Sequence, residues 1–288
     1  MKKNFLIRQY KSDSKYKIKH NYLSEQFKNN GKIFSDIKKL VKDGDFTLGK
    51  NVEKFENNII KITGAKYCLG VGSGTDAIFL SLKALDIKEG DEVITTSYTF
   101  YATVGAIVTA GGKPIFVDIN DTLNIDPNEI EKKITKKTKA IVIVHWSGYA
   151  CDMERVMQIS KKYKVPLIED ACHGIKAKFN NQNLGTFGIT GCFSMHPLKN
   201  LNVWGDGGFL ITNSKKIFTK ISLLRNHGLV SRDKCKIYGF NSRLDSIQAI
   251  VANNMLTKIN KITNSRINPT KNRLLDSYLL YRCCALAK

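Results

Sequence analysis

Polar residues follow three predicted buried strands, and each residue type can take part in catalysis. In GCFSMHPLKNLNVWGDGG (191–208), Lys199 comes after an apolar strand and before a glycine-rich stretch. In PLIEDACHG (166–174), a strand ends in two adjacent acids, and in GVGSGTDA (70–77), glycines separate a strand from a helix. Ligands of parallel sheets bind beyond the carboxyl ends of the strands. The three segments are therefore candidates for one binding site.

The glycine turn of residues 70–77 could bind a phosphate group. Backbone amides at a helix N-terminus attract anions, and Thr75 adds a hydroxyl. Gly70, Gly72 and Gly74 also resemble the glycines of a dinucleotide fingerprint. Their spacing is G-x-G-x-G, however, and no acid clearly ends the next strand. A third interpretation is a tight turn with only a structural role.

Glu169 and Asp170 are adjacent, so only one of them can point into a pocket at the strand end. Such an acid could be a helix N-cap. It could also be a carboxylate aimed at a cationic ring nitrogen, with His173 beside it. Asp170 and His173 alone provide too few ligands for a metal site.

Lys199 could be a solvated charge or a reactive amine. Ser194 precedes it by five residues, and the following GDGG (205–208) allows close backbone approach. A phosphate-binding turn, an acid for a pyridine nitrogen and an amine for a Schiff base are the groups that pyridoxal 5'-phosphate requires. The three segments together therefore predict this cofactor.

Helical and strand patterns alternate from about residue 50 onward, which predicts a mainly parallel sheet covered on both faces. Asp126, Pro127 and Glu129 have the sequence of a helix start. Residues from 243 to Lys288 are predicted to form one long helix. The predicted strands lie within 65–74, 91–96, 113–119, 139–146, 166–170, 191–195 and 208–212, and the predicted helices within 51–64, 75–85, 101–111, 126 onward, 153–163 and 215 onward.

The 288-residue chain is 42% hydrophobic and 25% charged, which is typical of a soluble globular protein. Its net charge of +21 could indicate nucleic acid or an anionic membrane. The lysines are spread along the chain, however, so we predict no nucleic-acid or membrane partner. The densest run, residues 132–139, is interpreted as a solvated face.

Neither a membrane span nor a signal peptide is predicted. No stretch approaches about 18 apolar residues, and the basic N-terminus has only three consecutive apolar residues. A cytoplasmic location is expected. The seven cysteines lack C-x-x-C spacing, which predicts reduced thiols without a disulfide, a zinc site or a catalytic role. They are Cys68, Cys151, Cys172, Cys192, Cys235, Cys283 and Cys284.

The chain resembles the sugar aminotransferases of the DegT/DnrJ/EryC1/StrS family, which are fold-type-I enzymes that use pyridoxal phosphate. The resemblance extends from GDFTLGKNVEKFE to GFNSRLDSIQA. The motifs GSGTDAIFLSLKAL, GDEVITTSYTFYAT, IEDACHGIKA, GCFSMHPLKN, GDGG, RNHGL and NSRLDSIQA stand in the family's order.

The resemblance implies an α/β fold, with a mainly parallel seven-stranded sheet sandwiched by helices and a small C-terminal domain. We expect residues 1–250 to form the cofactor-binding large domain, with 1–46 as an N-terminal segment. Family members continue past the SIQA helix, so residues 251–288 are expected to be a linking helix and the start of a truncated small domain.

The resemblance also implies roles for single residues. Lys199 would form the Schiff base and move a proton, for which it must be neutral. Asp170 would pair with the pyridinium nitrogen. Phe100 could instead be a core aromatic. The other implied cofactor contacts are His173 with the phenolic oxygen, Phe100 with the ring face, and Gly74, Thr75 and Ser194 with the phosphate.

Two further residues are implied to contact a neighbouring subunit and the amino donor. Asn241 would reach the phosphate in the neighbouring subunit, which implies a homodimer with shared sites, and Arg243 would bind the carboxylate of the amino donor. The implied reaction moves an amino group from an amino acid, with L-glutamate expected, to a keto group of a nucleotide-activated deoxysugar. Its product would enter polysaccharide, glycan or secondary-metabolite synthesis. The alternative is a truncated, impaired relative that binds the cofactor or a partner subunit without turnover.

Overall fold

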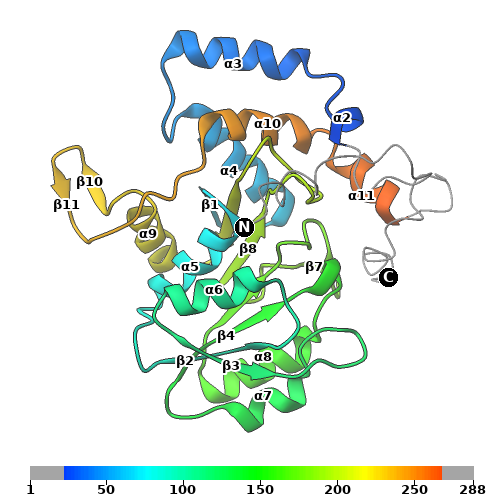
Figure 1. The fold of residues 1–288 in the computed structure, drawn as a ribbon, viewed down its shortest axis with the longest axis vertical. Helices are drawn as coiled ribbons and strands as arrows, with labels where there is room; N and C mark the ends of the chain where they lie inside the picture. The colour runs from blue at the N-terminus through cyan, green and yellow to red at the C-terminus, as the bar shows by residue number, and fades with distance from the viewer. Residues whose placement is uncertain (1–22, 268–288) are drawn as a thin grey trace, which may run out of the picture.

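The structure is a computed structural model, and it describes residues 23–267. A seven-stranded sheet forms its centre (Figure 1). Six strands run parallel, and β9 runs antiparallel to both of its neighbours, which confirms the predicted mainly parallel sheet. In spatial order the strands are β1 (Tyr67–Val71), β9 (Gly208–Thr212), β8 (Thr190–Ser194), β5 (Leu167–Asp170), β4 (Thr138–Val144), β2 (Glu92–Thr96) and β3 (Lys113–Val117).

Helices cover both faces of this sheet. One core cluster joins the sheet to α5, α6 and α9, and two clusters on the other face join it to α3, α4 and α10 and to α7 and α8. The helices are α2 (Leu23–Gln26), α3 (Gly31–Asp43), α4 (Lys50–Thr63), α5 (Gly74–Ala84), α6 (Tyr101–Thr109), α7 (Pro127–Lys133), the 3-10 helix η1 (Trp146–Gly148), α8 (Met153–Tyr163), α9 (Lys215–Leu224), α10 (Ser246–Leu256) and α11 (Ile259–Ile267).

The side chains of β4 show how the strand sequence specifies this layering. Ile141 and Ile143 pack into the cluster with α7 and α8, whereas Val142 packs into the cluster with α5 and α6. Successive side chains of a strand point to opposite faces, so a strand covered on both faces is apolar throughout. The continuous apolar run of β4 therefore requires helices on both sides.

Helix ends also follow local sequence signals. Gly64 ends α4 in the left-handed conformation, with φ of 75°. The Asp126 carboxylate accepts a hydrogen bond from the Asn128 N–H, and Pro127 occupies the first turn of α7. The predicted helix start at Asp126 is confirmed. The lysine-rich run of residues 132–139 connects α7 to β4, and its lysines are exposed.

The prediction of one long helix after residue 243 is wrong. The structure has α10 and α11, which are separated at Thr257 and Lys258. The Thr257 hydroxyl donates to the Asn254 carbonyl oxygen, and the Lys258 N–H bonds to the Met255 carbonyl, three residues back. These two bonds end the regular helical pattern. Residues 268–288 of the predicted helix lie outside the described residues.

The sequence pattern does not predict helix α3, because only Ile33 and Leu40 of its residues are buried. It packs on α10, which in turn packs on α4 (Figure 1). Helix α10 crosses residue 250 without a break, and the division of the chain at that position stays a prediction. Two small hairpins complete the described part, namely β6 (Lys178–Phe179) with β7 (Gln182–Asn183), and β10 (Leu229–Ser231) with β11 (Lys234–Cys235).

The β10–β11 hairpin projects from the body of the protein, at the left of Figure 1. Within residues 23–267, no helix is both long and apolar enough to cross a membrane. The five cysteines in this range are free, and no cluster of ligand side chains in it could hold a metal ion. Cys283 and Cys284 lie outside the described residues.

Candidate active site

The ends of β1, β5 and β8 meet at the glycine turn before α5. A Cβ atom added to Gly74 would lie 2.6 Å from the Ser194 Cβ and 2.9 Å from the Cys172 Sγ. Ser194 ends β8, and Cys172 follows β5 by two residues. The absence of a side chain at residue 74 therefore lets three predicted segments touch.

The GDGG stretch brings a fourth backbone to the same place. A Cβ on Gly208 would lie 2.3 Å from the Ser73 carbonyl carbon and oxygen and 2.6 Å from the Gly74 nitrogen. The predicted close backbone approach is confirmed at Gly208. Ser73 caps α5 by accepting a hydrogen bond from the Asp76 N–H at 3.0 Å, and the next hydroxyl, on Thr75, is exposed.

Asp170 is the acid that faces this site. Its side chain is buried at the end of β5, where Oδ2 accepts a hydrogen bond from the Thr103 hydroxyl at 2.8 Å. Oδ1 accepts from the Cys172 N–H at 3.2 Å. The residues after Asp170 form turns and not a helix, so the N-cap interpretation is wrong. Asp170 is a buried acceptor at the strand end.

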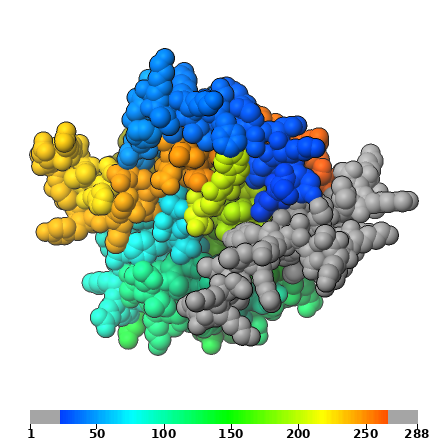
Figure 2. All heavy atoms as spheres, turned by 45° about the horizontal axis from the view of Figure 1, so that its top comes forward, coloured from blue at the N-terminus to red at the C-terminus, as the bar shows by residue number. Residues whose placement is uncertain are grey.

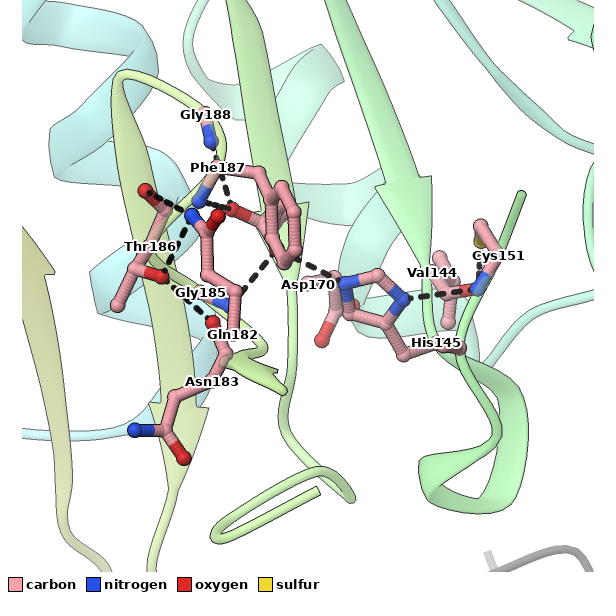
Figure 3. A network of polar contacts seen from close by, with 12 residues as sticks. Val144, His145, Cys151, Asp170, Gln182, Asn183, Gly185, Thr186, Phe187 and Gly188 are labelled. Carbon is pink, nitrogen blue, oxygen red and sulfur yellow. Dashed lines mark hydrogen bonds and ion pairs between the residues drawn. The ribbon is translucent and has the colours of Figure 1, made fainter. Parts of the chain in front are cut away.

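Glu169 points to the other face of β5 and has a structural role. Its carboxylate accepts backbone N–H bonds from Gly185, Phe187 and Gly188 at 2.7–2.8 Å, and it lies 3.1 Å from His145 Nε2. Figure 3 labels these three donors and His145. The Cys151 N–H donates to His145 Nδ1 at 3.2 Å, so the ring proton is on Nε2 and is donated to Glu169.

Lys199 lies in the loop between β8 and β9, close to Asp170 and Cys172. This loop is yellow-green in Figure 2, where it reaches the surface between the blue N-terminal helices and the cyan segment that includes α5. Burial lowers the pKa of Lys199, although Cys172 and Asp170 act in the opposite direction. Lys199 is half-buried and its surroundings disfavour the ammonium form, which favours the reactive amine over a solvated charge.

Cys172 stays a thiol in this environment. Burial raises its pKa, and Asp170 raises it further. A protonated thiol is a poor nucleophile, which agrees with the absence of a predicted catalytic role for this residue.

Aromatic side chains lie around the entrance to α6. Phe100 is the N-cap residue of this helix and is 55% exposed, with its ring centroid 4.0 Å from that of Tyr101. The core interpretation of Phe100 is therefore wrong. The Trp146 ring lies 4.5 Å from Tyr98 and 6.0 Å from His173, centroid to centroid. His173 thus lies beside an aromatic group on η1.

Arg243 and Asn241 bond to each other next to the glycine turn. Arg243 Nε donates to Asn241 Oδ1 at 3.0 Å, and Nη1 donates to Asn226 Oδ1 at 3.3 Å. The Gly72 N–H donates to the Ser242 hydroxyl between them at 3.4 Å. The structure therefore brings Arg243 close to this site, while the contact of Asn241 with a neighbouring subunit stays a prediction.

Sequence reasoning missed several residues of this site. Thr103 shares a helix face with the buried Ala106 and Ile107, three and four residues later, and this spacing could have identified it. His145 directly follows the apolar strand β4, and this position could have indicated its structural contact with Glu169. Nothing in the local sequence of Cys172 indicates that it contacts Gly74.

The described residues fit pyridoxal phosphate. The turn at Gly74 leaves a backbone without a side chain next to Ser194, as a phosphate cradle requires. The Asp170 carboxylate suits a protonated ring nitrogen, and the weakly basic Lys199 suits an amine that condenses with an aldehyde. Asp170 and Lys199 would hold the ring, and Gly74, Thr75 and Ser194 would hold the phosphate.

Three curated relatives are similar to this chain. A Geobacillus stearothermophilus protein named "Pleiotropic regulatory protein" is 40% identical over 88% of this chain. A UDP-N-acetyl-3-dehydro-alpha-D-glucosamine 3-aminotransferase of Acidithiobacillus ferrooxidans is 40% identical over 76% of it. A 3-oxo-glucose-6-phosphate:glutamate aminotransferase of Bacillus subtilis is 38% identical, also over 76%. The aligned regions cover 69%, 60% and 50% of the lengths of these relatives.

Solved structures share the fold. DesV of S. venezuelae, solved with a ketimine intermediate, matches 85% of this chain and 67% of its own, with a TM-score of 0.82 and 31% identity. The protein ntda of Bacillus subtilis, solved with bound PMP, matches 84% of this chain and 58% of its own, with a TM-score of 0.77 and 33% identity. The predicted fold class is confirmed.

The family assignment rests on most of the chain. The sequence profile of the DegT/DnrJ/EryC1/StrS aminotransferase family matches residues 28–275, which include every residue of the site described above. The chain belongs to the DegT/DnrJ/EryC1/StrS aminotransferase family.

Proposed function

We propose that the protein is a pyridoxal-phosphate-dependent aminotransferase that moves an amino group from an amino acid to a keto group of a nucleotide-activated sugar. The arrangement of Lys199, Asp170 and the Gly74 turn at one sheet edge carries this proposal. The family membership and the PMP in the related Bacillus subtilis structure support the cofactor. The names of the relatives support a sugar substrate.

When bound, the cofactor supplies an aldehyde that condenses with amines and a ring that accepts electrons from the adjacent carbon. Asp170 would hold the ring through its nitrogen, from a strand end fixed in the sheet. The Gly74 turn and the hydroxyls of Thr75 and Ser194 would hold the phosphate. Lys199, which is close to Asp170, would then be within reach of the reacting group.

Lys199 is the acid and base of this site. Because its pKa is lowered, its Nζ atom is neutral at a lower pH than that of an exposed lysine. Neutral Nζ would take a proton from the substrate carbon and pass it to the cofactor. The neighbouring thiol of Cys172 stays protonated and does not compete for this proton.

The finer parts of the function are also proposals. L-Glutamate is the donor, and Arg243 binds its carboxylate. The enzyme is a cytoplasmic homodimer in which Asn241 contacts the phosphate of the neighbouring site. The exposed aromatic rings of Tyr98, Phe100 and Tyr101 supply apolar surface for such an interface. The product enters polysaccharide, glycan or secondary-metabolite synthesis. Residues 1–250 form the large domain.

The test is the visible absorbance of the protein with pyridoxal phosphate, measured beside Lys199→Ala and the control Lys66→Ala at an exposed lysine. We expect a yellow band in the wild type and the control, bleached by L-glutamate, and no band in Lys199→Ala. UDP- and dTDP-linked keto sugars then restore the band if they accept the amine. A folded wild type without a band rejects the proposal.

The second candidate is a relative that binds the cofactor or a partner subunit without turnover. The Geobacillus relative favours this candidate, because its name describes a regulatory protein and does not mention an enzyme activity. A band that L-glutamate and other amino acids leave unbleached supports this second function and rejects the first.

A further inference from the structure

We propose that Thr103 is a positioning residue for Asp170 and that its hydroxyl keeps the carboxylate aimed at the ring nitrogen of the cofactor. The inference rests on the proposed function. It adds a residue that none of the three catalytic segments contains, because Thr103 belongs to α6 and not to a strand end.

The first observation is a buried hydrogen bond between Thr103 and Asp170. Thr103 is buried in the first turn of α6, and its hydroxyl donates to Asp170 Oδ2 at 2.8 Å. Asp170 Oδ1 accepts from the Cys172 N–H. The carboxylate thus has one fixed partner on each oxygen, which defines the rotation of its plane. Without the hydroxyl, only the Cys172 N–H would hold that plane.

A second threonine sets the direction of this bond. The hydroxyls of Thr99 and Thr103 are 2.8 Å apart. Because the single proton of the Thr103 hydroxyl points to Asp170, Thr99 donates to Thr103, which is nearer than its other acceptor, the Phe100 carbonyl oxygen at 3.4 Å. The result is a chain of two hydroxyls that ends on the carboxylate, and hydrogen bonds in such a chain strengthen one another.

Helix α6 carries both this pair of hydroxyls and the aromatic residue that would contact the cofactor ring. Phe100, the residue expected to stack on the ring face, is the N-cap of the same helix, and Thr99 precedes it. One rigid turn therefore carries the aromatic ring and the hydroxyls that orient the acid. Helix α6 would therefore contact the cofactor through Phe100 and act on it indirectly through the bond of Thr103 to Asp170.

Thr103→Val tests the role because valine has the shape of threonine without the donor. We expect the dissociation constant for pyridoxal phosphate to rise roughly ten-fold, as for the loss of a hydrogen bond to a charged group. Thr103→Ser should restore the affinity. The control is Thr95→Val, which removes an equally buried hydroxyl that donates to the Val142 carbonyl oxygen at 2.9 Å, away from the site.

A cofactor analogue with carbon in place of the ring nitrogen separates positioning from general structure. If Thr103 acts through Asp170 on that nitrogen, Thr103→Val and the wild type bind the analogue equally well. Equal loss of affinity for both ligands overturns the proposal, as does unchanged affinity for pyridoxal phosphate. Failure of the wild type to bind pyridoxal phosphate instead rejects the proposed function.

If Thr103→Val does not fold, Thr99→Val decides the matter. Thr99 is only half-buried, so its replacement is less disruptive. We expect a smaller rise in the dissociation constant, of about two- to three-fold, again absent with the analogue. If Thr103→Val does not fold and a folded Thr99→Val variant binds pyridoxal phosphate with unchanged affinity, the proposal is overturned.

Discussion

Lys199 couples the stability of the protein to pH. Its pKa is lowered from the ordinary value of 10.5, so the unfolded chain binds more protons between the folded value and 10.5, and stability increases with pH in that window. We expect Lys199→Met to raise the melting temperature of the cofactor-free protein at neutral pH. The gain should shrink as the pH approaches 10.5.

Thermal unfolding across this pH range, with Lys66→Met as the control at an exposed lysine, checks the prediction. A melting temperature of Lys199→Met that stays equal to that of the wild type at every pH would contradict it.

The adjacent acids of β5 should separate stability from cofactor binding. Glu169→Ala leaves three backbone donors and His145 without their acceptor, which we expect to cost at least about 1–3 kcal/mol of unfolding free energy. Asp170→Asn keeps the shape of the residue, so it should change stability little and weaken cofactor binding strongly. Urea unfolding and absorbance titration measure the two effects, and the reverse assignment would refute the prediction.

At the scale of the elements, the contact between β9 and the turn before α5 depends on Gly208. A methyl group there would lie 2.3 Å from the Ser73 carbonyl, where the backbone must move. We expect Gly208→Ala to destabilise the protein by about 1–3 kcal/mol and to weaken phosphate binding. The control is Gly105→Ala in α6, which meets no atom within 4 Å and should stabilise the helix by about 0.5–1 kcal/mol. If Gly208→Ala and Gly105→Ala changed the free energy of unfolding in urea equally, the contact at Gly208 would be ruled out.

The elements could largely be predicted from the sequence, because their signals are local. The apolar run of β4 and the cap at Asp126 depend on neighbouring residues only. The break between α10 and α11 could not be predicted, since it results from the bond of the Thr257 hydroxyl to a carbonyl that the apolar pattern does not reveal.

The same distinction holds for the site. Asp170 and Lys199 stand at strand ends, where position indicates function. Thr103 was missed because its partner Asp170 is 67 residues away. The pattern of α6 marks Thr103 as buried, but only the packing of α6 on the sheet shows which group it meets.

At the scale of the whole molecule, one ion pair joins three distant segments. Arg225 Nη1, just after α9, donates to Glu56 of α4 at 2.6 Å and to the Gly70 carbonyl oxygen of β1 at 2.7 Å. Glu56 also accepts from the Gly70 N–H at 2.8 Å. We expect Arg225→Met to cost roughly 3 kcal/mol, because it leaves the largely buried Glu56 carboxylate without its cation.

Adding Glu56→Gln to Arg225→Met should recover part of that loss, since the unpaired charge is then removed. Urea unfolding of the two single variants and the double variant measures the coupling. Strictly additive losses would show that the pair does not link these segments.

The reversed direction of β9 also bears on how proteins of this architecture can diversify. Because β8 and β9 are antiparallel neighbours, the loop that carries Lys199 leaves and re-enters the sheet on adjacent strands, and the Met195 N–H bonds to the Gly207 carbonyl at 2.8 Å across its base. A parallel neighbour would need a helical crossover there. The loop therefore has fixed ends in the sheet, and an exchange of residues 196–206 between relatives must keep Leu201 and Val203, which are buried in the core cluster with α3, α4 and α10.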